Sequence, residues 1–224
     1  SSDVCSSDLP RGFLFENVPS LRGMCTAGFE ELLRRLKSHG YCIYHNTLAA
    51  SDFGAPTVRQ RLFVVGLRTD NVTRCFEFPA ATHGARGEKT LFDSNTELKP
   101  YWTVGQALEG LPDVKTPEAG CHLNHTGRFH RPETIEHMMT VPQGVAIKQS
   151  YRYRPALGGL CRSLTAGLDS STKSYIHPVY HREMSVREYA RLHCFPDTWD
   201  FAGTHHNGIK QVANAVPIPL GKAV

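Results

Sequence analysis

The first forty residues combine one apolar run of strand length with one segment of helical spacing. Residues 13–15 read FLF and run into the segment ENVP at 16–19, which is typical of a buried strand that stops. From Thr26 onward, apolar side chains recur on one helical face, and basic residues crowd the last turn before Gly40. The apolar positions are Phe29, Leu32, Leu33 and Leu36. The pattern predicts a strand and then a helix that Thr26 caps and Gly40 ends.

Two further apolar runs predict that the chain continues as a sheet. Residues 41–48 and 61–67 have strand character, and the sequence GAP at 54–56 predicts a turn between them. The order strand, helix, strand, turn, strand favours one flank of an α/β sheet.

The residue composition and the periodicity of the chain change near residue 80. Residues from about 80 to 178 are rich in Gly, Pro, His, Thr and Arg and hold no long periodic element, so we expect a loop-rich region. Regular structure returns at 185–188, where SVRE matches a capping box, and FPD at 195–197 ends the predicted helix.

Composition narrows the class of protein only slightly. Hydrophobic residues make up 40% of the 224, so a packed core is expected. The net charge of +4, from 25 basic and 21 acidic residues, permits nucleic-acid binding without arguing for it. No apolar run is long enough for a bilayer, and we see no signal peptide. Seven widely spaced cysteines without a CxxC pair favour reduced thiols over a disulfide framework.

Residues 1–9 read SSDVCSSDL, a short near-repeat without helix or strand periodicity. We interpret them as an assembly scar rather than native sequence and leave them out of the fold prediction. On that interpretation, native chain upstream of Pro10 is missing.

Glu16 is the first candidate for chemistry, because it follows a predicted buried strand. Ligands of open α/β sheets bind beyond the carboxyl ends of strands. A buried carboxyl favours its protonated form, which can donate a hydrogen bond. The alternative is an ordinary surface or helix-capping acid.

Arg59 and Arg61 form the second candidate. Side chains two positions apart on a strand share a face, so two guanidiniums could form a fork for a base edge or a phosphate. The alternative is an exposed strand edge that pairs with surface acids.

Five segments, spread over nearly the whole chain and in family order, resemble motifs of the DNA cytosine-5 methyltransferases. They are ENVP at 16–19, FGAPTVRQRLF at 53–63, RSLT at 162–165, HP at 177–178 with SVREYARL at 185–192 and FPD at 195–197, and QVANAVP at 211–217. Any one of these segments is a weak signal, but the ordered set is specific.

The resemblance implies an α/β fold with a partial, Rossmann-like sheet of an S-adenosylmethionine-dependent methyltransferase. Residues 10–114 would form the C-terminal half of the catalytic domain. Residues 115–178 would form a small irregular target-recognition domain, and residues 179–224 would return to the catalytic domain.

The resemblance also implies roles for individual residues. Glu16 would hydrogen-bond or protonate ring N3 of a flipped-out cytosine, while a cysteine thiolate adds to C6 and S-adenosyl-L-methionine supplies the methyl group. Arg61 would hold the cytosine carbonyl with Arg59 as its structural or electrostatic partner, and Asn17 would orient the catalytic loop. Asn214 and Ala215 would line the cofactor pocket.

The chain departs from the family at three places. Thr57 and Ala213 stand where the family usually has Gln and Gly, and we expect both to be tolerated. The Pro-Cys-Gln loop and the Gly-rich cofactor motif are absent from the sequence, so the nucleophile is missing. We therefore expect a truncated enzyme that is inactive alone. The alternatives are the non-catalytic DNA-recognition subunit of a split enzyme, and an RNA-directed relative.

Double-stranded DNA is the expected partner, together with a complementary methyltransferase subunit if the enzyme is split. Arg152 and Arg154 alternate with tyrosines, so they would share one face and contact phosphates, or form a solvated strand edge. The predicted DNA-binding residues are Lys148, Arg152, Arg154, Arg162, Ser163 and Thr165. We expect a cytoplasmic, nucleoid-associated protein of bacterial or phage origin.

A metal site is the remaining alternative for the middle of the chain. Cys121, His122 and His125 could begin one, but no tight second pair follows, so we predict that no metal is bound.

Overall fold

The computed structural model divides the chain into two compact units, Ser1–Leu48 with Gln60–Ala80, and Ala49–Arg59 with Ala81–Val224. The residues that the structure describes are 9–24, 26–71, 75–85, 97–128, 130–147, 152–164 and 175–224. Among them, no helix is both long and apolar enough to cross a bilayer.

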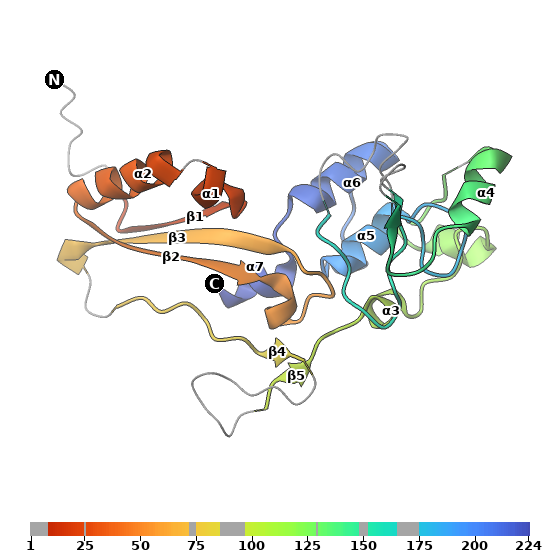
Figure 1. Ribbon diagram of the computed structural model, residues 1–224, viewed down its shortest axis with the longest axis horizontal. Coiled ribbons are helices and arrows are strands. Elements are labelled where there is room, and N and C mark those ends of the chain that lie inside the picture. Colours follow the sequence, from red (N-terminus) through yellow and green to blue (C-terminus); the bar gives the residue numbers. More distant parts are fainter. Residues whose placement is uncertain are drawn as a thin grey trace. The chain divides into compact units, whose positions relative to one another are not determined.

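The first unit is built on a three-stranded sheet in the order β1-β3-β2 (Figure 1). Its strands are β1 (Gly12–Asn17), β2 (Tyr41–Ala49) and β3 (Gln60–Arg68). The apolar runs predicted all three strands, but the expected burial of β1 is wrong, because Leu14 is 56% and Phe15 37% exposed. β1 and β3 are antiparallel, with Glu16 opposite Phe63, so the end of β1 lies beside the start of β3.

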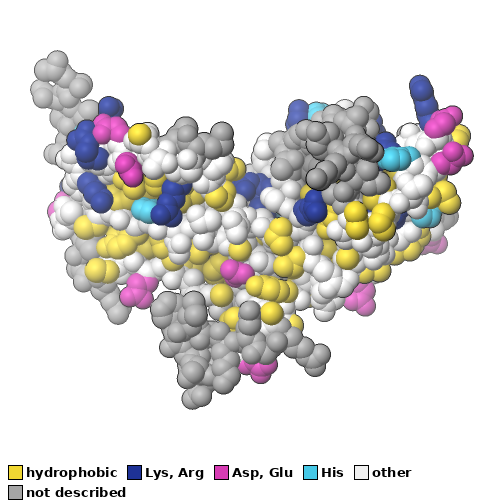
Figure 2. Space-filling view, in the orientation of Figure 1, with side chains coloured by type: hydrophobic (Ala, Val, Ile, Leu, Met, Phe, Trp, Pro, Cys, Tyr) yellow, Lys and Arg dark blue, Asp and Glu magenta, His cyan; other side chains and the backbone are white. Residues whose placement is uncertain are grey.

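Helices α1 (Ser20–Met24) and α2 (Thr26–Ser38) follow β1, and η3 (Thr69–Asn71) follows β3. Phe29 of α2 is buried against Leu62 and Val64 of β3, which confirms the predicted apolar face, although Leu32 remains exposed. Thr26 donates its hydroxyl backward to the carbonyls of Arg22 and Gly23. Lys and Arg side chains gather over the outer face of α2 (Figure 2).

The second unit contains short helices joined by long loops, as the composition of residues 80–178 and their lack of a long periodic element predicted. Gly54, at φ 96°, ends the first 3-10 turn and begins the predicted GAP turn. The helical elements are η2 (Ala50–Phe53), α3 (Val104–Leu108), η4 (Pro117–Cys121), α4 (Pro132–Met139), α5 (Val186–Leu192), α6 (His205–Asn214) and α7 (Ile218–Ala223). Two-residue strands pair as β4 (His83–Gly84) with β5 (Lys99–Pro100), and β6 (Ala146–Ile147) with β7 (Arg152–Tyr153).

Helix α5 is the centre of this unit. The predicted capping box is confirmed, because the Ser185 hydroxyl accepts from Glu188 N at 3.2 Å and the Glu188 carboxylate accepts from Ser185 N at 2.7 Å. Tyr189 and Leu192 are buried in a core that also contains side chains of α3 and α6.

The predicted domain boundaries at 114 and 178 do not separate the two compact units. Cys161 and Tyr175, which lie in the predicted recognition domain, belong to the same apolar core as Tyr189 of α5. Because these residues share one core, residues 81–224 belong to one compact unit. The division of the chain at 114 and 178 stays a prediction.

The close approach of β1 and β3 yields a stability prediction. A Cβ on Gly66 would lie 2.2 Å from the Phe13 ring, which packs edge-on against Tyr41 at 5.1 Å between centroids. Displacing this ring should make Gly66→Ala less stable by about 1–3 kcal/mol in the free energy of unfolding, measured by urea titration. Gly23→Ala is the control, because no atom lies within 4 Å of its added Cβ and alanine favours the helix. Equal stability of the two variants would contradict the packing.

Candidate functional site

The best-defined polar pair of the first unit joins the end of β1 to the start of β3. Arg61 Nε lies 2.6 Å from Glu16 Oε1, with the arginine side chain 10% and the glutamate side chain 31% exposed. Burial lowers the pKa of Arg61, and the charge of Glu16 opposes that shift. The structure therefore brings together two residues to which the resemblance assigns one cytosine, and the cause is the antiparallel register of the two strands.

Asn17 ends β1 beside this pair. Its side-chain oxygen accepts a hydrogen bond from Val18 N at 2.8 Å, which shapes the turn that leaves the strand. The side chain therefore acts on its own backbone, and its predicted role toward a catalytic loop stays a prediction.

Arg59 does not form the predicted fork with Arg61. It is 1% exposed and donates to the carbonyls of Leu164 and Ala213, and more weakly to the Ser163 hydroxyl at 3.5 Å. The expectation required one continuous strand, but β3 begins at Gln60, so Arg59 lies before it. Arg59 is thus a structural arginine of the second unit.

The prediction that Arg154 is exposed to DNA phosphates is wrong. Its side chain is buried and donates to the carbonyls of Val141 at 2.8 Å, Met138 at 2.7 Å and His177 at 2.6 Å. Burial lowers its pKa. The alternation of tyrosine and arginine indicated a strand edge. However, β7 is only two residues long, and Arg154, which comes directly after it, has a buried side chain.

The other predicted DNA-binding residues lie in different surroundings. Arg162 is exposed, with its guanidinium 4.7 Å from the centre of the Tyr153 ring, and Arg152 is half-buried on β7. Ser163 is half-buried beside Arg59. Lys148 and Thr165 lie outside the described residues.

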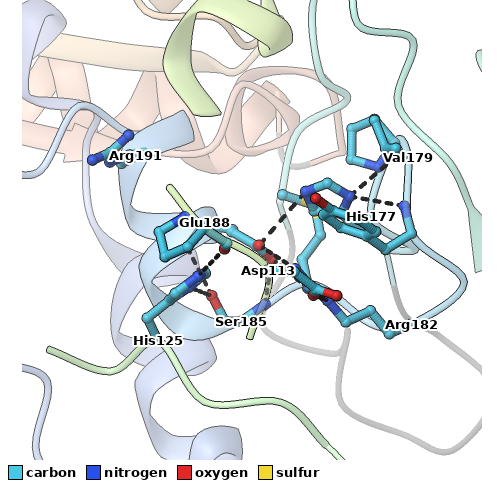
Figure 3. A network of polar contacts seen from close by, with 12 residues as sticks. Asp113, His125, His177, Val179, Arg182, Ser185, Glu188 and Arg191 are labelled. Atoms are coloured by element: carbon cyan, nitrogen blue, oxygen red, sulfur yellow. Dashed lines mark hydrogen bonds and ion pairs between the residues drawn. The ribbon is translucent and has the colours of Figure 1, made fainter. Parts of the chain in front are cut away.

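The second unit contains a buried polar network that the sequence did not predict (Figure 3). Arg182 donates to both oxygens of Glu188, at 2.8 and 2.9 Å, and to Asp113 at 2.8 Å. His177 Nε2 lies 3.6 Å from Glu188, while its Nδ1 accepts from Val179 N and Tyr180 N at 3.1 Å. The HP and SVRE segments contain His177 and Glu188 of this network. The sequence does not show that they meet Asp113, because that residue is far away along the chain.

A family model described as C-5 cytosine-specific DNA methylase matches residues 3–224. The chain belongs to this family.

Curated relatives of the chain are type II methyltransferases. The chain is 28% identical over 248 residues to M.SacI of Streptomyces achromogenes, covering 99% of the chain and 60% of the relative. It is 31% identical over 229 residues to M1.HphI of Haemophilus parahaemolyticus, covering 96% of the chain and 55% of the relative. The chain therefore spans about half to three fifths of the length of these relatives.

Solved structures confirm the expected α/β methyltransferase fold. A DNA modification methyltransferase encoded within a prophage of E. coli superposes with a TM-score of 0.73 at 24% identity, covering 96% of this chain and 67% of that one. The Dnmt2 methyltransferase of S. pombe superposes with a TM-score of 0.60 at 17% identity, covering 96% and 64%.

The thiols of the second unit differ in exposure. Burial raises the pKa of the Cys161 thiol far above its usual range, and burial raises that of Cys194 to about 12. Cys121 is exposed, but the nearby His125 uses both ring nitrogens, toward Ser185 Oγ at 2.7 Å and Pro112 O at 2.8 Å. Neither ring nitrogen of His125 is left for a metal.

The predicted cofactor residues lie at the end of α6. Asn214 is exposed, and no hydrogen bond of its amide occurs within the described part of the chain. Ala215 is half-buried and donates its backbone N–H to Gln211 and Val212. A free amide group can bind a polar ligand.

Burial lowers the pKa of His177 to about 4, although the charge of Glu188 favours protonation. Below a pH of about 6.5 the unfolded chain therefore binds a proton that the folded chain rejects, and stability falls as the pH falls toward 4. His177→Asn keeps an acceptor for Val179 N and should remove up to about 1.4 kcal/mol per pH unit of that slope. The measurement is the free energy of unfolding against pH, with the exposed His39→Asn as control. An unchanged slope in His177→Asn would contradict the buried neutral imidazole.

Proposed function

We propose that this chain supplies the cytosine-gripping and DNA-recognition parts of a DNA cytosine-5 methyltransferase, which transfers a methyl group from S-adenosyl-L-methionine to C5 of cytosine. The observation that carries the proposal is the pair of Glu16 and Arg61 at the junction of β1 and β3. Family membership and the type II methyltransferase relatives support it.

The chemistry of the pair matches one edge of cytosine. Ring N3 and the C2 carbonyl are adjacent acceptors. As the base binds, the Glu16 carboxylate takes up one proton from solvent and donates it to N3 in a hydrogen bond, while Arg61 keeps its Nε–H on Glu16 and donates another guanidinium N–H to the carbonyl. A base reaches such a site only after it leaves the helical stack. Withdrawing electron density at N3 makes C6 more electrophilic, which is the activation that a thiolate nucleophile requires.

The nucleophile in this proposal comes from residues outside the 224, either from the rest of a longer chain or from a complementary subunit. No Pro-Cys pair occurs in the sequence. The raised pKa values of Cys161 and Cys194 disfavour the thiolate, so neither buried thiol suits the role.

The cofactor supplies the methyl group when bound. Asn214 and Ala215 fit one edge of its site, because the exposed amide of Asn214 can donate to and accept from a polar ligand. The remaining contacts belong to the part that also supplies the nucleophile.

The chain alone should not methylate DNA. Incubation with labelled S-adenosyl-L-methionine and mixed-sequence duplex DNA should give incorporation at background, with an intact type II relative assayed in parallel as the positive control. Incorporation that persists after removal of contaminating enzymes, and disappears when one cysteine of the chain is replaced, would contradict the external nucleophile.

The cytosine grip can be tested without the nucleophile. The chain should bind a duplex with one unpaired cytosine about tenfold more tightly than a duplex with an unpaired thymine, because one charge-assisted hydrogen bond contributes about 1.5 kcal/mol or more. Thymine carries a hydrogen on N3 and opposes a donor there. Glu16→Ala should abolish the preference, whereas Glu16→Gln should keep much of it through its amide N–H.

Fluorescence anisotropy measures these affinities, and Glu30→Ala is the control, because Glu30 is an exposed acid of α2. A preference for thymine would show that Glu16 acts as an acceptor and would contradict the proposal. Tighter binding of an RNA duplex with the same unpaired cytosine would instead favour an RNA substrate.

A further inference from the structure

A pocket of about 320 Å³ lies in the second unit, and each polar side chain that lines it carries a hydrogen-bond donor. Its polar lining comes from Lys115, Arg128, His130, His181 and Arg182, with Ile135 on one wall. No carboxylate is among the residues that line it. Such a lining favours a ligand that is anionic and offers only acceptors.

The two histidines are fixed as donors by their partners. His130 Nε2 accepts from Glu183 N at 3.4 Å, which leaves the hydrogen on Nδ1. His181 Nδ1 accepts from the Arg154 guanidinium at 3.2 Å, which leaves the hydrogen on Nε2. Each imidazole can therefore offer one N–H to a ligand.

The three cations that line the pocket are matched by three carboxylates, so the net charge of these six groups is zero. Arg182 is neutralised by Asp113 and Glu188, and Arg128 lies 3.2 Å from Glu183. Lys115 is exposed and forms no ion pair with any residue that the structure describes. The three carboxylates are bound to Arg182 and Arg128 and do not line the pocket, so Lys115 is the cation that remains for a ligand.

Hydrogen bonds to buried groups fix two of the side chains that line the pocket. Figure 3 shows Arg182 fixed between Asp113 and Glu188, within the network that also contains His177. Arg154 fixes His181 and the carbonyls of the loop around it. The donors are therefore preorganised, which lowers the entropic cost of binding.

We propose that this pocket binds one phosphodiester group of the DNA backbone, through the ammonium group of Lys115, the guanidinium of Arg128 and the N–H groups of His130 and His181. The inference rests on the proposed function for its choice of DNA as the source of the phosphate. The anion site itself rests on the lining of the pocket.

The anion site is tested first with inorganic phosphate on the full 224-residue chain. Saturable shifts of the His130 and His181 imidazole signals are expected in NMR titrations with phosphate at constant ionic strength, and Lys115→Ala should weaken them. Lys222→Ala is the matched control, because Lys222 is an exposed lysine on α7. Phosphate that leaves both imidazole signals unchanged would overturn the proposal.

The DNA source is tested by salt dependence. The slope of log affinity against log salt for a duplex should be flatter by about 0.9 in Lys115→Ala, because one neutralised phosphate contributes about that much. His181→Ala should weaken binding with the parent's slope, since a neutral donor is lost. A parental slope in Lys115→Ala would overturn the assignment to DNA. Phosphate binding by a chain that binds no duplex would leave the anion site standing and overturn the proposed function.

Discussion

The second unit depends on hydrogen bonds from buried guanidinium groups to backbone carbonyls. Its helices are short and its strands contain two residues, so many carbonyls of its loops have no partner in regular structure. A buried carbonyl without a donor costs roughly 1–3 kcal/mol. Arginine carries five donors in a rigid fork and can satisfy several such carbonyls at once.

Three arginines do this in three places. Arg59 joins the segment at Leu164 to the end of α6, and Arg154 joins the end of α4 to the loop after His177. Arg187 of α5 donates to the carbonyls of Leu123, Pro196 and Trp199. Burial lowers the pKa of both Arg154 and Arg187, although the charges of Asp197 and Asp200 oppose this shift in Arg187. Loops held in this way can present a fixed set of donors to a ligand, as the pocket beside His181 does.

The sequence predicted the first unit well, because its signals are local. Apolar runs and helical spacing predicted β1, β3 and α2, and the family resemblance, which assigns Glu16 and Arg61 to one cytosine, implied that they meet. The second unit was predicted only as a loop-rich region. The partners of Arg154 are backbone carbonyls, which every residue carries, so no side-chain pattern marks them. The pocket draws donors from residues as far apart as Lys115 and Arg182, and only the fold brings them together.

The central claim is that Glu16 donates a hydrogen bond to N3 of a cytosine that Arg61 holds by its carbonyl. The most direct measurement is the nitrogen NMR signal of N3 in a duplex whose single unpaired cytosine is labelled at that atom. If Glu16 donates to N3, the signal moves toward the position of a hydrogen-bonded or protonated N3 when the chain binds. Glu16→Ala should abolish this movement. An N3 signal that stays at its free position in a duplex fully bound by the parent chain would contradict it.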